Sequence, residues 1–179
     1  DVGEPTVVAQ LQRSEQHNAL SPDFQRIASV DFKRKADLVI RPLHGRSGPS
    51  LRIPLESRTD RNYHLQFEGK GRFLAASSLK ESKVWDLSDL RVAVHVSPCT
   101  MDAPHFSSDG KLVSIVEHGR GVHVFELPTG TRKQTIEDSA LLSTTLMPDG
   151  SKILVERGGR GPIDRIVIGE TERETYFPI

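Results

Sequence analysis

HFSSDGKLVSIVEHGRGVHVFELPTG, residues 105–130, contains two turn signals between short apolar runs. Asp109-Gly110 is the first signal, because aspartate can bond its own backbone and glycine supplies a positive φ. Gly119-Arg120-Gly121 is the second, with glycines where a tight hairpin needs left-handed backbone. The runs beside them are rich in Val, Ile and Phe, which is typical of strands. Strands this close in sequence pair antiparallel, since a parallel pair needs a crossover of a dozen or more residues.

The same pattern recurs along the chain with a period near 40 residues. Asp149-Gly150 and Gly159-Arg160-Gly161 repeat the two turns, each 40 positions later. Residues 67–74 match residues 106–113 at a shift of 39, and residues 20–23 begin a more distant copy. A period of this length, with strands and no helices, predicts the blades of a β-propeller.

Several segments resemble WD40-type β-propeller repeats. Val84-Trp85-Asp86-Leu87 is similar to the signature that ends the third strand of a WD40 blade, and Val124-Phe125-Glu126-Leu127 is a variant of it. Ser21-Pro22-Asp23 and Met147-Pro148-Asp149-Gly150 resemble the Ser-Pro-Asp-Gly turn of that family. The resemblance covers about residues 18–170. Repeats with Pro-Asp-Gly turns, seen beside peptidases and in TolB-like proteins, fit the first and last units almost as well.

The chain departs from the WD40 pattern in two respects. No Gly-His dipeptide opens a repeat, and the single tryptophan leaves the other repeats without one. The buried Asp-His-Ser-Trp hydrogen-bond network of the family is therefore not expected here.

These observations predict an all-β fold made of about four blades, each a four-stranded antiparallel sheet. Residues 1–179 form a single propeller segment in this interpretation. Its units span about 18–61, 62–101, 102–142 and 143–179, and residues 1–17 supply a strand to a neighbouring or closing blade, with Val7–Leu11 as that strand. The resemblance to WD40 proteins implies a ring of about six to eight blades. We therefore expect this chain to be part of a larger propeller, to form a ring with a second copy, or to form a compact four-bladed ring.

The register of the turns makes two structural predictions. Strands at 26–30, 72–77, 112–117 and 152–156 should occupy equivalent places in successive sheets. Gly121 and Gly161 should lie at matched hairpin turns, and a positive φ there would make Gly121→Val destabilising by ~1–2 kcal/mol.

The composition argues against nucleic-acid and membrane binding. Twenty-four basic and 24 acidic residues give a formal net charge of zero, so no overall field attracts nucleic acid or an anionic membrane. No apolar run approaches the ~20 residues that span a bilayer. The only cysteine, Cys99, excludes an internal disulfide. We therefore expect a soluble, cytoplasmic protein.

Five features of the sequence are candidate sites, and each has a structural alternative. Cys99 has no local partner that would lower its pKa, so catalysis is not expected. His118 and His123 flank the Gly-Arg-Gly turn, but a zinc site needs further ligands, so we interpret both as surface histidines. Trp85 is interpreted as a packed blade residue. The basic run 33–35 and the Arg-Gly-Gly element at 157–161 are interpreted as hairpin turns.

The sequence thus predicts no catalytic, cofactor-binding or metal-ligating residue. The function it favours is a non-catalytic scaffold that binds one or more protein partners through loops on a rigid sheet framework. One alternative is a propeller attached to, or gating, a catalytic domain outside this chain, such as a peptidase or a signalling ATPase. Another is a propeller enzyme that uses its central channel, which needs convergent His, Asp or Glu residues at the inner strand ends. Self-association, or missing blades that complete the ring, is a further expectation.

Overall fold

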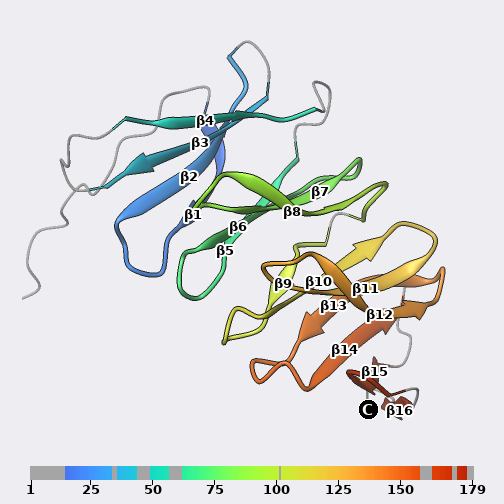
Figure 1. Cartoon of the computed structure of the whole chain (residues 1–179). Helices are drawn as coiled ribbons and strands as arrows, with labels where there is room; N and C mark the ends of the chain where they lie inside the picture. Colours follow the sequence, from blue (N-terminus) through green and yellow to red (C-terminus); the bar gives the residue numbers. More distant parts are fainter. Residues whose placement is uncertain are drawn as a thin grey trace, which may run out of the picture.

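The computed structural model describes residues 15–33, 36–43, 49–56, 62–100, 102–157, 163–170 and 173–176. These residues form four antiparallel sheets of four strands each, and no helix (Figure 1). The first two sheets contain β1 (Glu15–Leu20), β2 (Arg26–Asp31), β3 (Asp37–Pro42) and β4 (Leu51–Pro54), then β5 (His64–Phe67), β6 (Phe73–Ser77), β7 (Ser82–Asp86) and β8 (Arg91–Val96). The other two contain β9 (His105–Phe106), β10 (Leu112–Glu117), β11 (Gly121–Glu126) and β12 (Thr131–Glu137), then β13 (Leu141–Leu146), β14 (Lys152–Arg157), β15 (Ile163–Val167) and β16 (Arg173–Tyr176).

Every sheet is a simple meander in which strands adjacent in sequence are also hydrogen-bonded neighbours. The strands predicted at 26–30, 72–77, 112–117 and 152–156 are β2, β6, β10 and β14, each second in its sheet, which confirms the predicted equivalence. The same backbone hydrogen bond, 2.9–3.0 Å long, closes the turn before each of these strands. In each pair the N–H of the first residue donates to the carbonyl of the second: Ser21–Arg26, Glu68–Phe73, Ser107–Leu112 and Met147–Lys152. The repeat seen in the sequence is therefore a repeat of backbone geometry.

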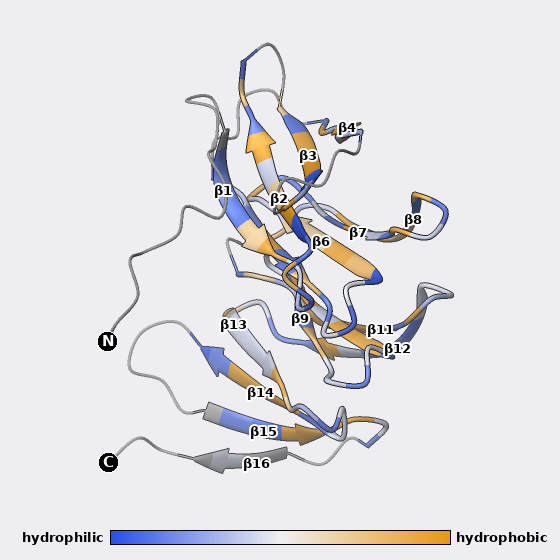
Figure 2. Ribbon diagram, turned by 90° about the vertical axis from the view of Figure 1, so that its left-hand side faces the viewer, coloured by the Kyte–Doolittle hydropathy of each residue, from blue (hydrophilic) through white to orange (hydrophobic). Residues whose placement is uncertain are grey.

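The sheets stack in sequence order, with the first and last at opposite ends (Figures 1 and 2). Among the described residues these two end sheets do not meet, so the four blades do not close a ring. The predicted strand Val7–Leu11 lies outside the described residues, as do Arg34, Lys35 and residues 158–161.

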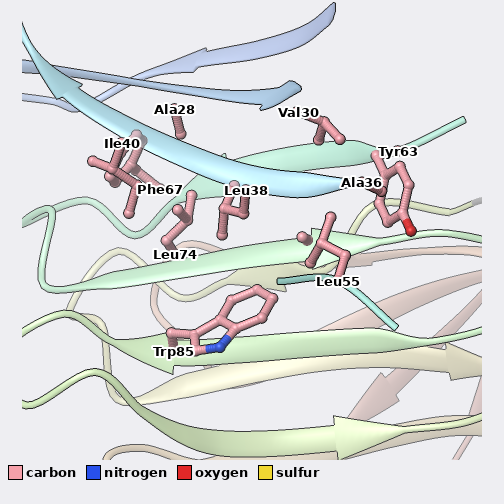
Figure 3. Packing of buried hydrophobic residues seen from close by; sticks show 11 residues of the cluster. Ala28, Val30, Ala36, Leu38, Ile40, Leu55, Tyr63, Phe67, Leu74 and Trp85 are labelled. Carbon is pink, nitrogen blue, oxygen red and sulfur yellow. The ribbon is translucent and has the colours of Figure 1, made fainter. Parts of the chain in front are cut away.

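Three apolar clusters lie between successive sheets and hold the stack together. Strands β6 and β7 are buried along their whole length because a neighbouring sheet covers each face. Figure 2 shows apolar stretches in β2, β6 and β14, whereas the turns between strands are mostly hydrophilic. Trp85 is buried at 2% exposure in the cluster between the first and second sheets, which confirms its interpretation as a packed blade residue (Figure 3).

Asp86, which follows Trp85, is a buried carboxylate that ties two strands together. Arg72 Nη2 lies 2.7 Å from Asp86 Oδ2, and the Ser88 hydroxyl donates to Oδ1 at 2.7 Å. The hydrogen bonds from Arg72 lower the pKa of Asp86, so the carboxyl is ionised at neutral pH. The guanidinium of Arg72 also lies 5.0 Å from the centre of the Phe73 ring.

We expect Asp86→Asn to lower the free energy of unfolding at pH 7 by about 1–3 kcal/mol, because an amide leaves charge-assisted bonds of Arg72 unmade. Urea unfolding followed by circular dichroism measures the loss. Asp89→Asn is the matched control, since the Asp89 side chain is 54% exposed and exposed pairs contribute little. Equal midpoints for the two variants would contradict the prediction.

Candidate functional site

The third strands of the second, third and fourth sheets carry an ionisable residue at the same position. Each of these residues contacts another ionisable side chain. Lys83, His123 and Asp164 lie opposite the fourth residue of β6, β10 and β14, respectively. Lys83 Nζ is 2.9 Å from Glu81 Oε2, His123 Nε2 is 2.6 Å from Glu117 Oε2, and Asp164 Oδ2 is 2.7 Å from Arg157 Nη1. The repeated position thus holds a polar pair in each of these sheets.

Two of these pairs also hold the segment that leads from the preceding sheet. Lys83 Nζ lies 2.7 Å from Glu56 Oε1, and Arg157 Nη2 lies 2.7 Å from Asp138 Oδ2. In the third sheet the backbone holds the corresponding segment, because Cys99, which follows β8, forms an antiparallel β-bridge with Glu117 of β10. Ion pairs and backbone bonds therefore join successive sheets in a chain that lacks the Asp-His-Ser-Trp pattern.

A cavity of about 630 Å³ opens at this end of the third sheet. We call it the His123 groove. Its polar lining comes from the end of β10, the β10–β11 turn, β11 and the edge strand β12, and includes Glu117, Arg120, His123, Arg132, Thr135 and Glu137.

The floor of the groove is a chain of three hydrogen-bonding side chains. Glu117 and His123 are buried, at 5% and 3% exposure. His123 Nδ1 is 3.1 Å from the Thr135 hydroxyl, and Arg120 Nη1 is 3.1 Å from Glu117 Oε1. Burial lowers the pKa of His123, with smaller contributions from the charges of Arg132 and Arg120, although Glu117 opposes them. A neutral imidazole then donates from Nε2 to Glu117 and accepts at Nδ1 from Thr135.

The lowered pKa of His123 predicts that acid destabilises the fold. In the unfolded chain a histidine titrates near pH 6.5, so on acidification the unfolded state binds this proton before the folded state does. The stability from neutral His123 is complete above that pH and is lost as the pH falls through the lower folded pKa. We expect unfolding midpoints in urea to fall between pH 7.5 and about 5.5, and His123→Gln to weaken this dependence.

His118→Gln is the control for this titration, because His118 is exposed in the β10–β11 turn. That variant should keep the full pH dependence of the unmodified chain. An unchanged slope in His123→Gln would assign the acid sensitivity to other groups and contradict the prediction.

The structure corrects the interpretation of His123 as a surface histidine. Its strand position turns the side chain toward Glu117 and Thr135, and His118 does not bond to it. Within the described ranges, no group of three or more His, Cys, Asp or Glu side chains is placed to hold a metal ion.

Cys99 lies in the core between the second and third sheets. Burial, with a smaller effect of the charge of Glu117, raises the pKa of its thiol to about 12. A thiol that stays protonated at neutral pH is a poor nucleophile.

Solved propeller structures match the chain over almost its whole length. The β-propeller domain of Cps50 (Swd1) from Myceliophteria thermophila matches 91% of it at a TM-score of 0.63 and 13% identity. U3-55K matches 96% at 0.67 and 15% identity, and the RRP9 WD40 repeats match 96% at 0.66 and 16% identity. The chain has the fold of a WD40-type β-propeller segment.

The segment spans 59%, 54% and 53% of the length of those three chains, respectively, so it corresponds to part of a WD40 propeller. No family model and no curated protein matches its sequence. None of the described residues belongs to a helix long and apolar enough to cross a membrane.

In this propeller segment, a second polar group lies beside the first strands of the third and fourth blades. The carboxylate of Asp102 accepts the Thr144 backbone N–H at 2.8 Å and the Ser143 hydroxyl at 3.3 Å, and His105 Nε2 lies 4.0 Å away. Burial raises the pKa of Asp102. The group joins the start of the third blade to β13 of the fourth, which is a structural task, and it supplies no support for a channel enzyme.

Proposed function

We propose that this propeller segment is a non-catalytic scaffold that holds a protein partner at the His123 groove. The observation that carries the proposal is a cavity of about 630 Å³ at the end of the β10–β11 hairpin, lined by charged side chains. Within the part of the chain that is described, Arg132 and Glu137 have no ion-pair partner, so both are available to another molecule. Arginine is enriched in protein interfaces, and turns on a rigid framework commonly carry binding residues.

Site-specific photo-crosslinking tests the proposal. A photoreactive residue at Ser139, on the rim of the groove, should capture one defined protein from cell extract. Arg132→Glu should reduce that capture at least about fivefold, as expected for a residue that contributes ~1 kcal/mol or more to binding.

Lys111 provides the control, because it is exposed in the β9–β10 turn at the opposite end of the same sheet. A crosslinker at Lys111 should not capture this protein, and Lys111→Glu should leave the capture at Ser139 unchanged. Identical products from both positions, or undiminished capture by Arg132→Glu, would refute the groove as the binding site.

We also propose that residues 1–179 act as one propeller segment with units at about 18–61, 62–101, 102–142 and 143–179, and with residues 1–17 serving a neighbouring or closing blade. Further blades, or a second copy, would complete the ring. The balanced charge of the chain supports a partner other than nucleic acid or a membrane. A cytoplasmic location is consistent with the single, buried cysteine.

A further inference from the structure

We infer that the His123 groove recognises an oxyanion, a carboxylate or phosphate group on the protein partner, and that binding is coupled to protonation of His123. This inference rests on the proposed scaffold function and names the chemical group that the groove receives.

Two guanidinium groups reach the groove from different elements. Arg120 comes from the β10–β11 turn, and its side chain is 75% exposed although Nη1 contacts Glu117. Arg132 comes from β12, with its guanidinium carbon 5.6 Å from the centre of the Phe125 ring. Both line the same cavity as His123. Arg120 contacts Glu117 through Nη1, and Arg132 has no ion-pair partner among the described residues, so most of their N–H donors remain available to a ligand. Arginine forks match carboxylate and phosphate oxygens.

The acidic residues of the lining are largely neutralised by their own partners. Glu117 is engaged by Arg120 and His123, and Asp138 is engaged by Arg157 of β14 at 2.7 Å. Glu137 is the exposed acid without such a partner among the described residues, and it lies five residues beyond Arg132 on β12. Along a strand this separation is about 16 Å. The Arg132 end of the groove therefore favours an anion.

The floor of the groove links anion binding to one proton. In the neutral state the Thr135 hydroxyl donates to His123 Nδ1, so its hydrogen is not available to a ligand in the groove. When His123 takes up a proton from solvent, Nδ1–H becomes a donor and the Thr135 oxygen accepts from it. The Thr135 hydrogen is then free to donate to an oxyanion, and the imidazolium adds a positive charge beneath the site. A bound anion thus favours protonated His123, and by linkage protonation tightens binding.

The test is a titration of the full chain, followed through the imidazole resonances of His123 by NMR. The probes are sodium sulfate, inorganic phosphate and sodium acetate, at constant ionic strength. Sulfate does not change its charge between pH 6 and 7.5, so it isolates the proton taken up by the protein. We expect a saturable shift of the His123 resonances, and sulfate binding at least about threefold tighter at pH 6 than at pH 7.5.

Three variants make the inference falsifiable. Arg132→Gln should weaken binding at least about fivefold, and Glu137→Gln should tighten it about twofold by removing a negative charge. Arg91→Gln removes an exposed arginine from β8 of another blade and should change nothing. Preference for acetate would indicate an Asp or Glu of the partner, and preference for phosphate a phosphorylated residue.

No saturable shift with any probe up to about 50 mM, or equal affinity in Arg132→Gln, would overturn the inference. So would sulfate binding that does not depend on pH. The crosslinking from Ser139 is measured without these probes, so a failure of the oxyanion inference can be distinguished from a failure of the scaffold proposal.

Discussion

Trp85→Ala is expected to lower the free energy of unfolding by about 3–5 kcal/mol. The indole is 2% exposed and packs in the cluster between the first and second sheets, together with Leu38, Leu55 and Leu74 (Figure 3). Sheets on both sides of this cluster fix their side chains through backbone ladders, so they relax little into the space that the indole vacates. The loss therefore includes a cavity cost as well as the lost burial of the ring.

Urea unfolding measures this effect, and circular dichroism is the suitable signal because Trp85 is the only tryptophan. Leu79→Ala is the control, since Leu79 is 50% exposed in the β6–β7 turn and should change the stability by no more than about 0.5 kcal/mol. A Trp85→Ala midpoint close to that of Leu79→Ala would show that the two sheets do not depend on this cluster.

The blade architecture could be predicted from the sequence because it is encoded in turns. Asp109-Gly110 and Asp149-Gly150 precede β10 and β14, and the same backbone bond closes each turn. Apolar residues then fill the second and third strands, which neighbouring sheets cover on both faces. Turn chemistry and apolar runs are local signals, so one sequence shows them without any knowledge of the packing.

The strands that escaped prediction lack those signals. Strand β12, TRKQTIE, is polar along most of its length because it is the outer edge of its sheet and is largely exposed. Charged side chains are typical of such edges, where they discourage pairing with other chains. Strand β1, EQHNAL, begins with four polar residues. These strands form because the backbone of the neighbouring strand hydrogen-bonds to them. That pairing is a tertiary interaction, so local sequence patterns do not predict it.

The same limitation explains why the groove was missed. Given strands at 112–117 and 122–125, hairpin register already places His123 diagonal to Glu117, so that half of the floor was accessible from the sequence. Thr135 and Arg132 both belong to β12, the strand that the pattern did not reveal. The polar pair between neighbouring strands could therefore be predicted from the sequence, whereas the cavity beside it depends on a strand that the sequence pattern did not show.

Gly121→Val is expected to lower the free energy of unfolding by about 3–5 kcal/mol, which is more than the sequence alone predicted. Gly121 has a φ of 130°, which confirms the positive value expected from the hairpin, whereas Gly161 lies outside the described residues. An added Cβ would collide with the carbonyl oxygen of Ile136 and would lie 2.9 Å from the Asp138 nitrogen. Both are backbone atoms, so the neighbouring strand cannot move aside as a side chain would. Overpacking thus adds to the φ strain.

The matched pair Gly121→Ala and Gly119→Ala separates these two causes. Gly119 also has a positive φ, of 73°, but an added Cβ would meet no atom within 4 Å. Gly119→Ala therefore carries only the left-handed strain, about 1–2 kcal/mol, while Gly121→Ala carries the collision as well. Urea midpoints of the two variants give the difference directly. If Gly121→Ala proved no less stable than Gly119→Ala, the close approach of β12 to this glycine would not be a constraint on the third blade.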